Sequence, residues 1–136
     1  MAEPFKFELV SPERLLMSAP VDQVVVPGSE GYFTVLKGHA PFMSTLRPGV
    51  VDVTPAGGGT VTRVFVRGGF ADVNIDGLTI LAEQAIPLAE VNADMLAEEV
   101  RNAEEDLADA RDGAARDVAA LRLNQLKEVQ TALGRS

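Results

Sequence analysis

The sequence predicts an α+β protein in two segments, an antiparallel β-sandwich or barrel followed by an antiparallel two-helix hairpin. Ten of the 12 glycines, all eight prolines and all seven aromatic residues lie before residue 88. This first part contains short runs of alternating polar and apolar residues, as in half-buried strands. After it, apolar residues recur every three or four positions, as on one face of a helix. We therefore expect a β-sandwich domain at 1–87 and an α-helical hairpin at 88–136.

The alternation of side chains is clearest in FKFELV, where Phe5, Phe7 and Leu9 point to one face and the residues between them to the other. Turn residues separate the later runs. Gly68-Gly69 and Asp76-Gly77 supply the positive φ angles that tight hairpin turns require. The expected strands are 5–10, 21–26, 32–36, 50–54, 60–67, 70–75 and 78–82.

Two helices are expected after Pro87, with Asn92 or Asp94 capping the first and Asp112-Gly113 separating it from the second. Short polar side chains cap a helix because they accept hydrogen bonds from its unpaired first N–H groups. The apolar stripe of the first helix comprises Leu96, Val100, Ala103, Leu107 and Ala110. That of the second, which ends at Gly134, comprises Val118, Leu121, Leu126, Val129 and Leu133.

Charge differs between the two arms of the predicted hairpin. Residues 88–112 hold nine acids and two arginines, whereas 113–136 hold four bases and two acids. One interpretation is a pair of solvated faces that attract each other. The other is that one arm exchanges its partner for a differently charged surface. Two alanines in the stripe of the first arm bury little area, so the hairpin is expected to be marginally stable.

Composition excludes several functional classes. The 136 residues carry a net charge of −8, which argues against nucleic acid and anionic lipid as partners. There is no cysteine, no apolar run of roughly 20 residues, and no signal-peptide pattern at the N-terminus. We expect a cytosolic protein without membrane insertion, which can still lie at a membrane surface by binding a membrane protein.

The segment 24–51, VVVPGSEGYFTVLKGHAPFMSTLRPGVV, is the most distinctive stretch. Its glycines and prolines lock sharp bends. It lacks the Lys-Ser/Thr pair of a phosphate-binding loop, and a single histidine with no cysteine does not make a zinc site. His39 is either a hydrogen-bonded corner residue or an interface contact. We predict a docking surface, with no catalytic residue and no metal.

This sequence resembles the epsilon subunits of bacterial F-type ATP synthases, whose mitochondrial counterpart is called delta. The resemblance runs from about Phe5 to the C-terminus and is loose in the hairpin. Its most specific motifs are PGSEG at 27–31, GHAP at 38–41, RPG at 47–49 and GGF at 68–70, followed by LAEQA at 81–85.

The resemblance implies a ten-stranded sandwich with two helices, in a non-catalytic rotor subunit of the central stalk. Such a subunit links the gamma subunit to the c-ring, couples proton flow to ATP synthesis, and sits peripherally on the cytoplasmic face of the bacterial inner membrane. By position, the c-ring contact is Ser29, Glu30, Gly31 and Tyr32, with His39 nearby. The gamma-facing residues are Leu46, Pro48 and Val50. The family commonly has an acid where Tyr32 stands.

The resemblance also implies two roles for the hairpin. In parts of the family it extends along gamma and inhibits ATP hydrolysis, which can involve the catalytic alpha/beta head. Some members bind ATP there, and the nearest match to their motif is Ala97–Asn102, with Glu98, Arg101 and Arg122 as the nucleotide contacts. The match is weak, so we expect no cofactor. Competing hypotheses are a stand-alone nucleotide sensor and a hydrolase that uses His39.

Overall fold

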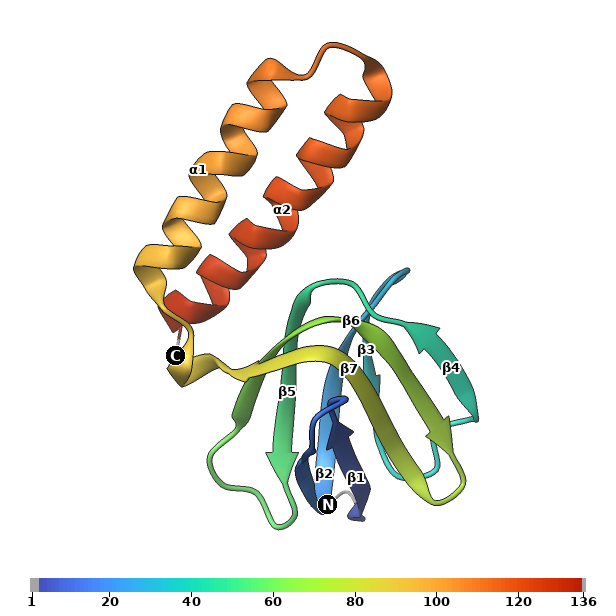
Figure 1. Cartoon of the computed structure of the whole chain (residues 1–136). Helices are drawn as coiled ribbons and strands as arrows, with labels where there is room; N and C mark the ends of the chain where they lie inside the picture. The colour runs from blue at the N-terminus through green and yellow to red at the C-terminus, as the bar shows by residue number, and fades with distance from the viewer. Residues whose placement is uncertain (1–2, 136) are drawn as a thin grey trace. The chain divides into compact units, whose positions relative to one another are not determined.

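A computed structural model describes residues 3–135 and divides the chain into two compact units, Met1–Leu88 and Ala89–Ser136 (Figure 1). The first unit consists of β-strands and the second of two helices. The strands are β1 Phe5–Val10, β2 Leu15–Gly28, β3 Gly31–Val35, β4 Phe42–Thr45, β5 Gly49–Pro55, β6 Thr62–Asn74 and β7 Gly77–Pro87.

The strands form one sheet in the order β1-β7-β6-β5-β2-β3, and an additional pairing of β1 with β2 closes five of them into a ring. All pairings are antiparallel except that of β1 with β7, and β4 pairs with β6 beside the ring. The predicted antiparallel sandwich or barrel is thus confirmed in outline. Closure removes most of the unpaired strand edges that would otherwise invite aggregation.

The strand count implied by the resemblance was wrong: the described residues contain seven strands, not ten. Three strands are long, with 14 residues in β2, 13 in β6 and 11 in β7 (Figure 1). Each pairs with different neighbours along its length. β2, for example, pairs with β1 in its first half and with β3 and β5 in its second. Counting each long strand as two would give ten.

The turn predicted at Gly68-Gly69 was also wrong, because β6 continues through both residues. Their φ angles of +67° and +106° bend the strand without reversing it. A side chain at Gly69 would collide with the backbone carbonyl of Leu81 on β7. The hairpin at Asp76-Gly77 is confirmed, with Ile75 and Asp76 as its loop.

The core lies inside the ring and follows the predicted alternation. Phe5, Phe7 and Leu9 of β1 are buried, as expected, and all described residues that are fully buried with large side chains are apolar. Each large apolar side chain gains roughly 1.5–3 kcal/mol on burial. The other strands contribute Val21, Val24, Val26, Val35, Val51, Val53, Val64, Val66, Ala71, Val73, Leu78, Ile80 and Ala82.

A 3-10 turn, Leu88–Glu90, spans the boundary between the units, and the second unit contains α1 Ala93–Asp109 and α2 Gly113–Arg135. Asn92 caps α1, as one of the two predicted alternatives, because its side chain accepts from the N–H groups of Asp94 and Met95. Asp112 caps α2 by accepting from Ala115 N at 2.7 Å. Within residues 3–135, no helix is long and apolar enough to cross a membrane.

The buried face of α2 differs from the predicted stripe. Val118 and Leu121 are 69% and 56% exposed. Among the residues of α2 whose burial is described, those buried are Ala119, Leu123, Leu126, Val129 and Ala132. Apolar residues occupy more than one face of this helix, and the face with two small alanines allows the closest approach to another element. The predicted stripe of α1 holds better: Leu96, Val100 and Ala103 are buried, and Leu107 is half-buried.

Candidate partner-binding surfaces

The β2–β3 turn is a two-residue loop of Ser29 and Glu30 between the paired residues Gly28 and Gly31. Both loop side chains are exposed. Gly31 has a φ of +134°, a conformation that favours glycine. The Ser29 N–H donates to the Thr45 carbonyl at 2.9 Å, which ties the turn to the end of β4. The turn therefore presents one carboxylate and one hydroxyl on a well-anchored backbone.

Tyr32 follows this turn on β3, and its side chain reaches β5. Its hydroxyl accepts from the Val50 N–H at 3.3 Å. The guanidinium carbon of Arg47 lies 5.2 Å from the centre of the Tyr32 ring, within the range of a cation–π contact. Tyr32 as a whole remains 43% exposed, so it is part of the surface as well as a link between strands.

His39 lies in the corner that follows β3. Its N–H donates to the Leu36 carbonyl at 3.1 Å, and its Nδ1 lies 2.7 Å from the Ala40 carbonyl oxygen. These contacts match the predicted corner residue. The turn containing Glu30 precedes β3 and His39 follows it, yet the His39 ring lies 6.5 Å from that of Phe33 in the middle of β3. The grouping of His39 with the turn stays a prediction.

The three residues expected to face gamma differ in accessibility. Leu46 belongs to the core and is 7% exposed, and its N–H donates to the Gly69 carbonyl at 2.9 Å. Val50 is 5% exposed, whereas Pro48 is half-buried. Of the three, only the Pro48 side chain has substantial surface to offer to another protein.

Sequence reasoning missed a more accessible apolar surface around β4. Phe42 and Met43 are 45% and 63% exposed. Phe42 packs edge-on against Phe33 of β3, with ring centres 5.3 Å apart, and Phe33 lies 6.5 Å from the His39 ring. The missed signal was the run PFMST, in which two large apolar residues stand together within a polar, loop-like stretch.

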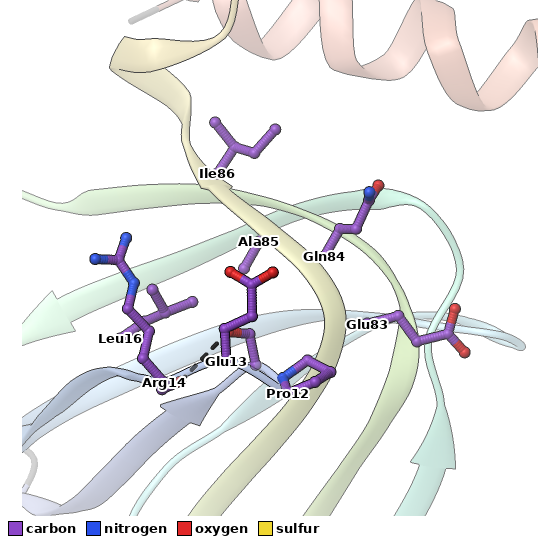
Figure 2. A pocket seen from close by; sticks show the side chains of 9 residues that line it. Pro12, Glu13, Arg14, Leu16, Glu83, Gln84, Ala85 and Ile86 are labelled. Atoms are coloured by element: carbon purple, nitrogen blue, oxygen red, sulfur yellow. Dashed lines mark hydrogen bonds between the residues drawn. The ribbon is translucent and has the colours of Figure 1, made fainter.

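A pocket of about 270 Å³ lies between the β1–β2 turn and β7 (Figure 2). Figure 2 shows Pro12, Glu13 and Arg14 on one side and the strand from Glu83 to Ile86 on the other. The Ser11 hydroxyl donates to the Arg14 carbonyl at 3.3 Å, which closes the turn rather than activating a nucleophile. The charged side chains lining the pocket are exposed. This arrangement is that of a surface groove rather than a reaction centre.

The predicted nucleotide contacts of the hairpin do not converge. Glu98 and Arg101 are exposed on α1, and Arg122 is exposed on α2. Arg122 Nη1 lies 3.5 Å from Asp106 Oδ2. Because Asp106 is five residues after Arg101, it lies about 140° around α1 from it. Arg122 is thus directed to a different face of α1 from the one that carries Arg101.

No group of three or more His, Cys, Asp or Glu residues suited to a metal ion occurs within residues 3–135. No described polar or charged residue is fully buried. The exposed turn, the cation–π contact of Tyr32 and the apolar surface around β4 are features of a protein that docks on others.

Comparison with known proteins agrees with this geometry. Residues 4–88 match the family model "ATP synthase, Delta/Epsilon chain, beta-sandwich domain". The ATP synthase epsilon chain of Parvibaculum lavamentivorans is 52% identical over 130 residues, covering 96% of this chain and 98% of the relative. That of Mesorhizobium japonicum is 51% identical over 133 residues, covering 98% of both chains.

Solved structures extend the similarity to both units. A chain in the cryo-EM structure of the Euglena gracilis mitochondrial ATP synthase, OSCP/F1/c-ring, aligns with a TM-score of 0.83 and 27% identity, covering 98% of this chain and 83% of that chain. A chain from the Tetrahymena thermophila ATP synthase central stalk/c-ring aligns with a TM-score of 0.71 at 15% identity, which shows a shared fold. The sandwich match and the half-identical full-length relatives together establish that this chain belongs to the ATP synthase delta/epsilon chain family.

Proposed function

We propose that this chain is the epsilon-type rotor subunit of a proton-translocating F-type ATP synthase, a non-catalytic part of the central stalk that links gamma to the c-ring. The observation that carries the proposal is its near-complete alignment, at 27% identity, with a chain of an ATP synthase assembly that contains F1 and the c-ring. Torque transmission needs a stiff scaffold and interfaces rather than acid–base groups. The closed ring of strands meets that need.

Within this role, the β2–β3 turn is the c-ring contact, formed by Ser29, Glu30, Gly31 and Tyr32. Exposure of Ser29 and Glu30 and the backbone anchor at Thr45 support the assignment. His39 is assigned to the same contact by its position in the family, and its ring lies 6.5 Å from that of Phe33, two residues after Gly31 on β3.

Gamma is assigned to the exposed apolar side chains of β4, Phe42 and Met43, together with the half-buried Pro48. Exposed aromatic and methionine side chains are enriched at protein interfaces. Leu46 and Val50 are buried, so they are not part of this surface. The assembled subunit then lies peripherally at the cytoplasmic face of the bacterial inner membrane.

A reconstitution experiment tests the rotor role. A catalytic head from the same organism that retains gamma but lacks this subunit is mixed with the purified full chain, and the mixture is separated by size. Stoichiometric co-elution is expected, and Phe42→Ser with Met43→Ser should abolish it. A folded chain that elutes alone from a head known to be competent would refute the proposal.

The hairpin is proposed to regulate ATP hydrolysis as a second function. Only three residues of α1, namely Leu96, Val100 and Ala103, are buried, so little apolar area holds this helix in place. Truncation after Leu88, the end of the first unit, should raise the ATPase rate of the reconstituted complex while co-elution persists. An unchanged rate would remove the inhibitory role and leave the rotor role intact.

A further inference from the structure

The Tyr32 hydroxyl takes the place of a β2 carbonyl in the hydrogen bonding between β2 and β5. In the β2–β5 ladder Val25 pairs with Asp52 and Val24 with Val53. Continued by two residues, this register would place Pro27 opposite Val50. The Pro27 carbonyl instead accepts from the Arg47 N–H at 3.1 Å. The Val50 N–H donates to the Tyr32 hydroxyl, which thereby replaces a strand carbonyl.

The residues around the Tyr32 hydroxyl leave space for it and hold its ring in place. Tyr32 pairs with Pro27 across β2 and β3, and its side chain extends toward the start of β5. A methyl group at Gly49 would lie 2.7 Å from both Pro27 Cβ and the Tyr32 hydroxyl, so only glycine leaves room there. Arg47 stacks on the ring at 5.2 Å. The ring is therefore held from the β4–β5 connection as well as from β3.

We propose that Tyr32 is a positioning residue, which locks the Ser29–Gly31 turn onto β5 and leaves Glu30 as the charged group offered to the partner. The partner is the c-ring, so this part of the inference rests on the proposed function. The Tyr32 hydroxyl affects partner binding indirectly, because it keeps the backbone of the Ser29–Gly31 turn ordered. The complementary feature expected on the c-ring loop is a cation or an N–H donor within reach of Glu30, since a carboxylate only accepts hydrogen bonds.

The locking role is tested on the isolated full chain by amide hydrogen exchange and ¹⁵N relaxation. Tyr32→Phe keeps the ring and its stacking on Arg47 but removes the hydroxyl. Exchange of the Val50 amide should become roughly fivefold faster, and the amides of Ser29 and Glu30 more mobile. Thr34→Val is the matched control, since it removes a hydroxyl from an exposed site two residues along β3 and should change neither signal. Unchanged Val50 exchange in Tyr32→Phe would overturn the proposal.

The positioning role is tested by a double-mutant cycle on binding to the detergent-solubilised c-ring–gamma complex. Glu30→Gln alone should weaken binding roughly threefold, and Tyr32→Phe alone by a similar or smaller factor. In the Glu30→Gln background, Tyr32→Phe should have no further effect, because it acts through the carboxylate. Additive losses would mean that the phenol contacts the c-ring directly, and would overturn the proposal.

Failure of the proposed function gives a different pattern. If the chain co-elutes with the head but neither variant alters c-ring binding, the assignment of the turn to the c-ring is wrong, and the positioning proposal falls with it. If only Glu30→Gln weakens binding, the c-ring contact stands and the positioning role of Tyr32 is refuted.

Discussion

Arg122 on α2 and Asp106 on α1 form an ion pair between the two helices, with Nη1 and Oδ2 3.5 Å apart. The pair joins the more basic arm to the acidic one, in agreement with the interpretation that the arms attract each other. Its side chains are 49% and 63% exposed, so water and salt screen the attraction. Most of the other acidic residues of α1 are exposed.

A double-mutant cycle at Asp106 and Arg122 should therefore give a small coupling energy. Asp106→Ala and Arg122→Ala are expected to couple by about 0.5 kcal/mol or less, measured from the thermal melting of the helical circular dichroism at 222 nm. The coupling should shrink further at 1 M salt. A coupling above about 1.5 kcal/mol would mean that the pair is desolvated in solution.

Two leucines of α2 differ in burial, which predicts that the same substitution lowers the free energy of unfolding by very different amounts at the two positions. Leu126 is 5% exposed and Leu121 is 56% exposed. Leu126→Ala should lower the free energy of unfolding by about 2–3 kcal/mol, because it removes buried area and leaves a cavity. Leu121→Ala, the matched control, should change it by less than about 0.5 kcal/mol. Equal losses in denaturant titrations would show that the other face of α2 is buried.

The two helix caps should each contribute measurably to hairpin stability. Asn92 Oδ1 accepts from Asp94 N and Met95 N, and Asp112 Oδ1 accepts from Ala115 N. Asn92→Ala and Asp112→Ala are each expected to cost about 1 kcal/mol. Asn102→Ala, at an exposed position inside α1, serves as the control and should be neutral or slightly stabilising. Equal losses of helix stability in all three variants, measured from helical melting curves, would contradict the assignment of Asn92 and Asp112 as caps.

Glycine 69 should be far less replaceable than glycine 57, although both have positive φ angles, of +106° and +82°. Gly57→Ala meets no atom within 4 Å and should cost only the conformational penalty of about 1 kcal/mol. Gly69→Ala would drive its methyl group into the Leu81 carbonyl, so we expect a loss of about 3 kcal/mol or more. Chemical denaturation of the two variants under identical conditions measures this difference.

Isolated chain should not bind ATP in calorimetric titration at millimolar nucleotide. Arg122 pairs with Asp106 rather than lying beside Arg101, so the cations needed for a triphosphate are dispersed. Binding that disappears in Arg101→Ala but persists in Arg111→Ala would reverse this expectation and revive a nucleotide-sensing role for the hairpin.

Local chemistry explains most of what could be predicted from the sequence. The alternation in FKFELV correctly predicted which side of β1 is buried, and the cap at Asn92 follows from short-range hydrogen bonding. The motifs of the first part predicted the family through their resemblance to its members in order and spacing. The comparisons confirm that prediction.

Errors arose where the outcome depends on residues far away in the chain. Gly68-Gly69 has the composition of a turn, but pairing on both sides with β7 keeps β6 extended. Leu46 and Val50 were expected at a surface, yet the ring of strands buries them.

The sequence by itself determined the two structural classes, the hairpin at Asp76-Gly77, the start of the first helix and, through resemblance, the family. The first three depend on φ preferences, side-chain periodicity and hydrogen bonds within a few residues. Only the tertiary structure decided that Tyr32 bonds to Val50, which is 18 residues away, and that α2 buries Leu126 rather than Leu121. Such outcomes depend on which segments meet in space. Many arrangements satisfy the same local pattern, and burial and long-range pairing decide which of them has the lowest free energy.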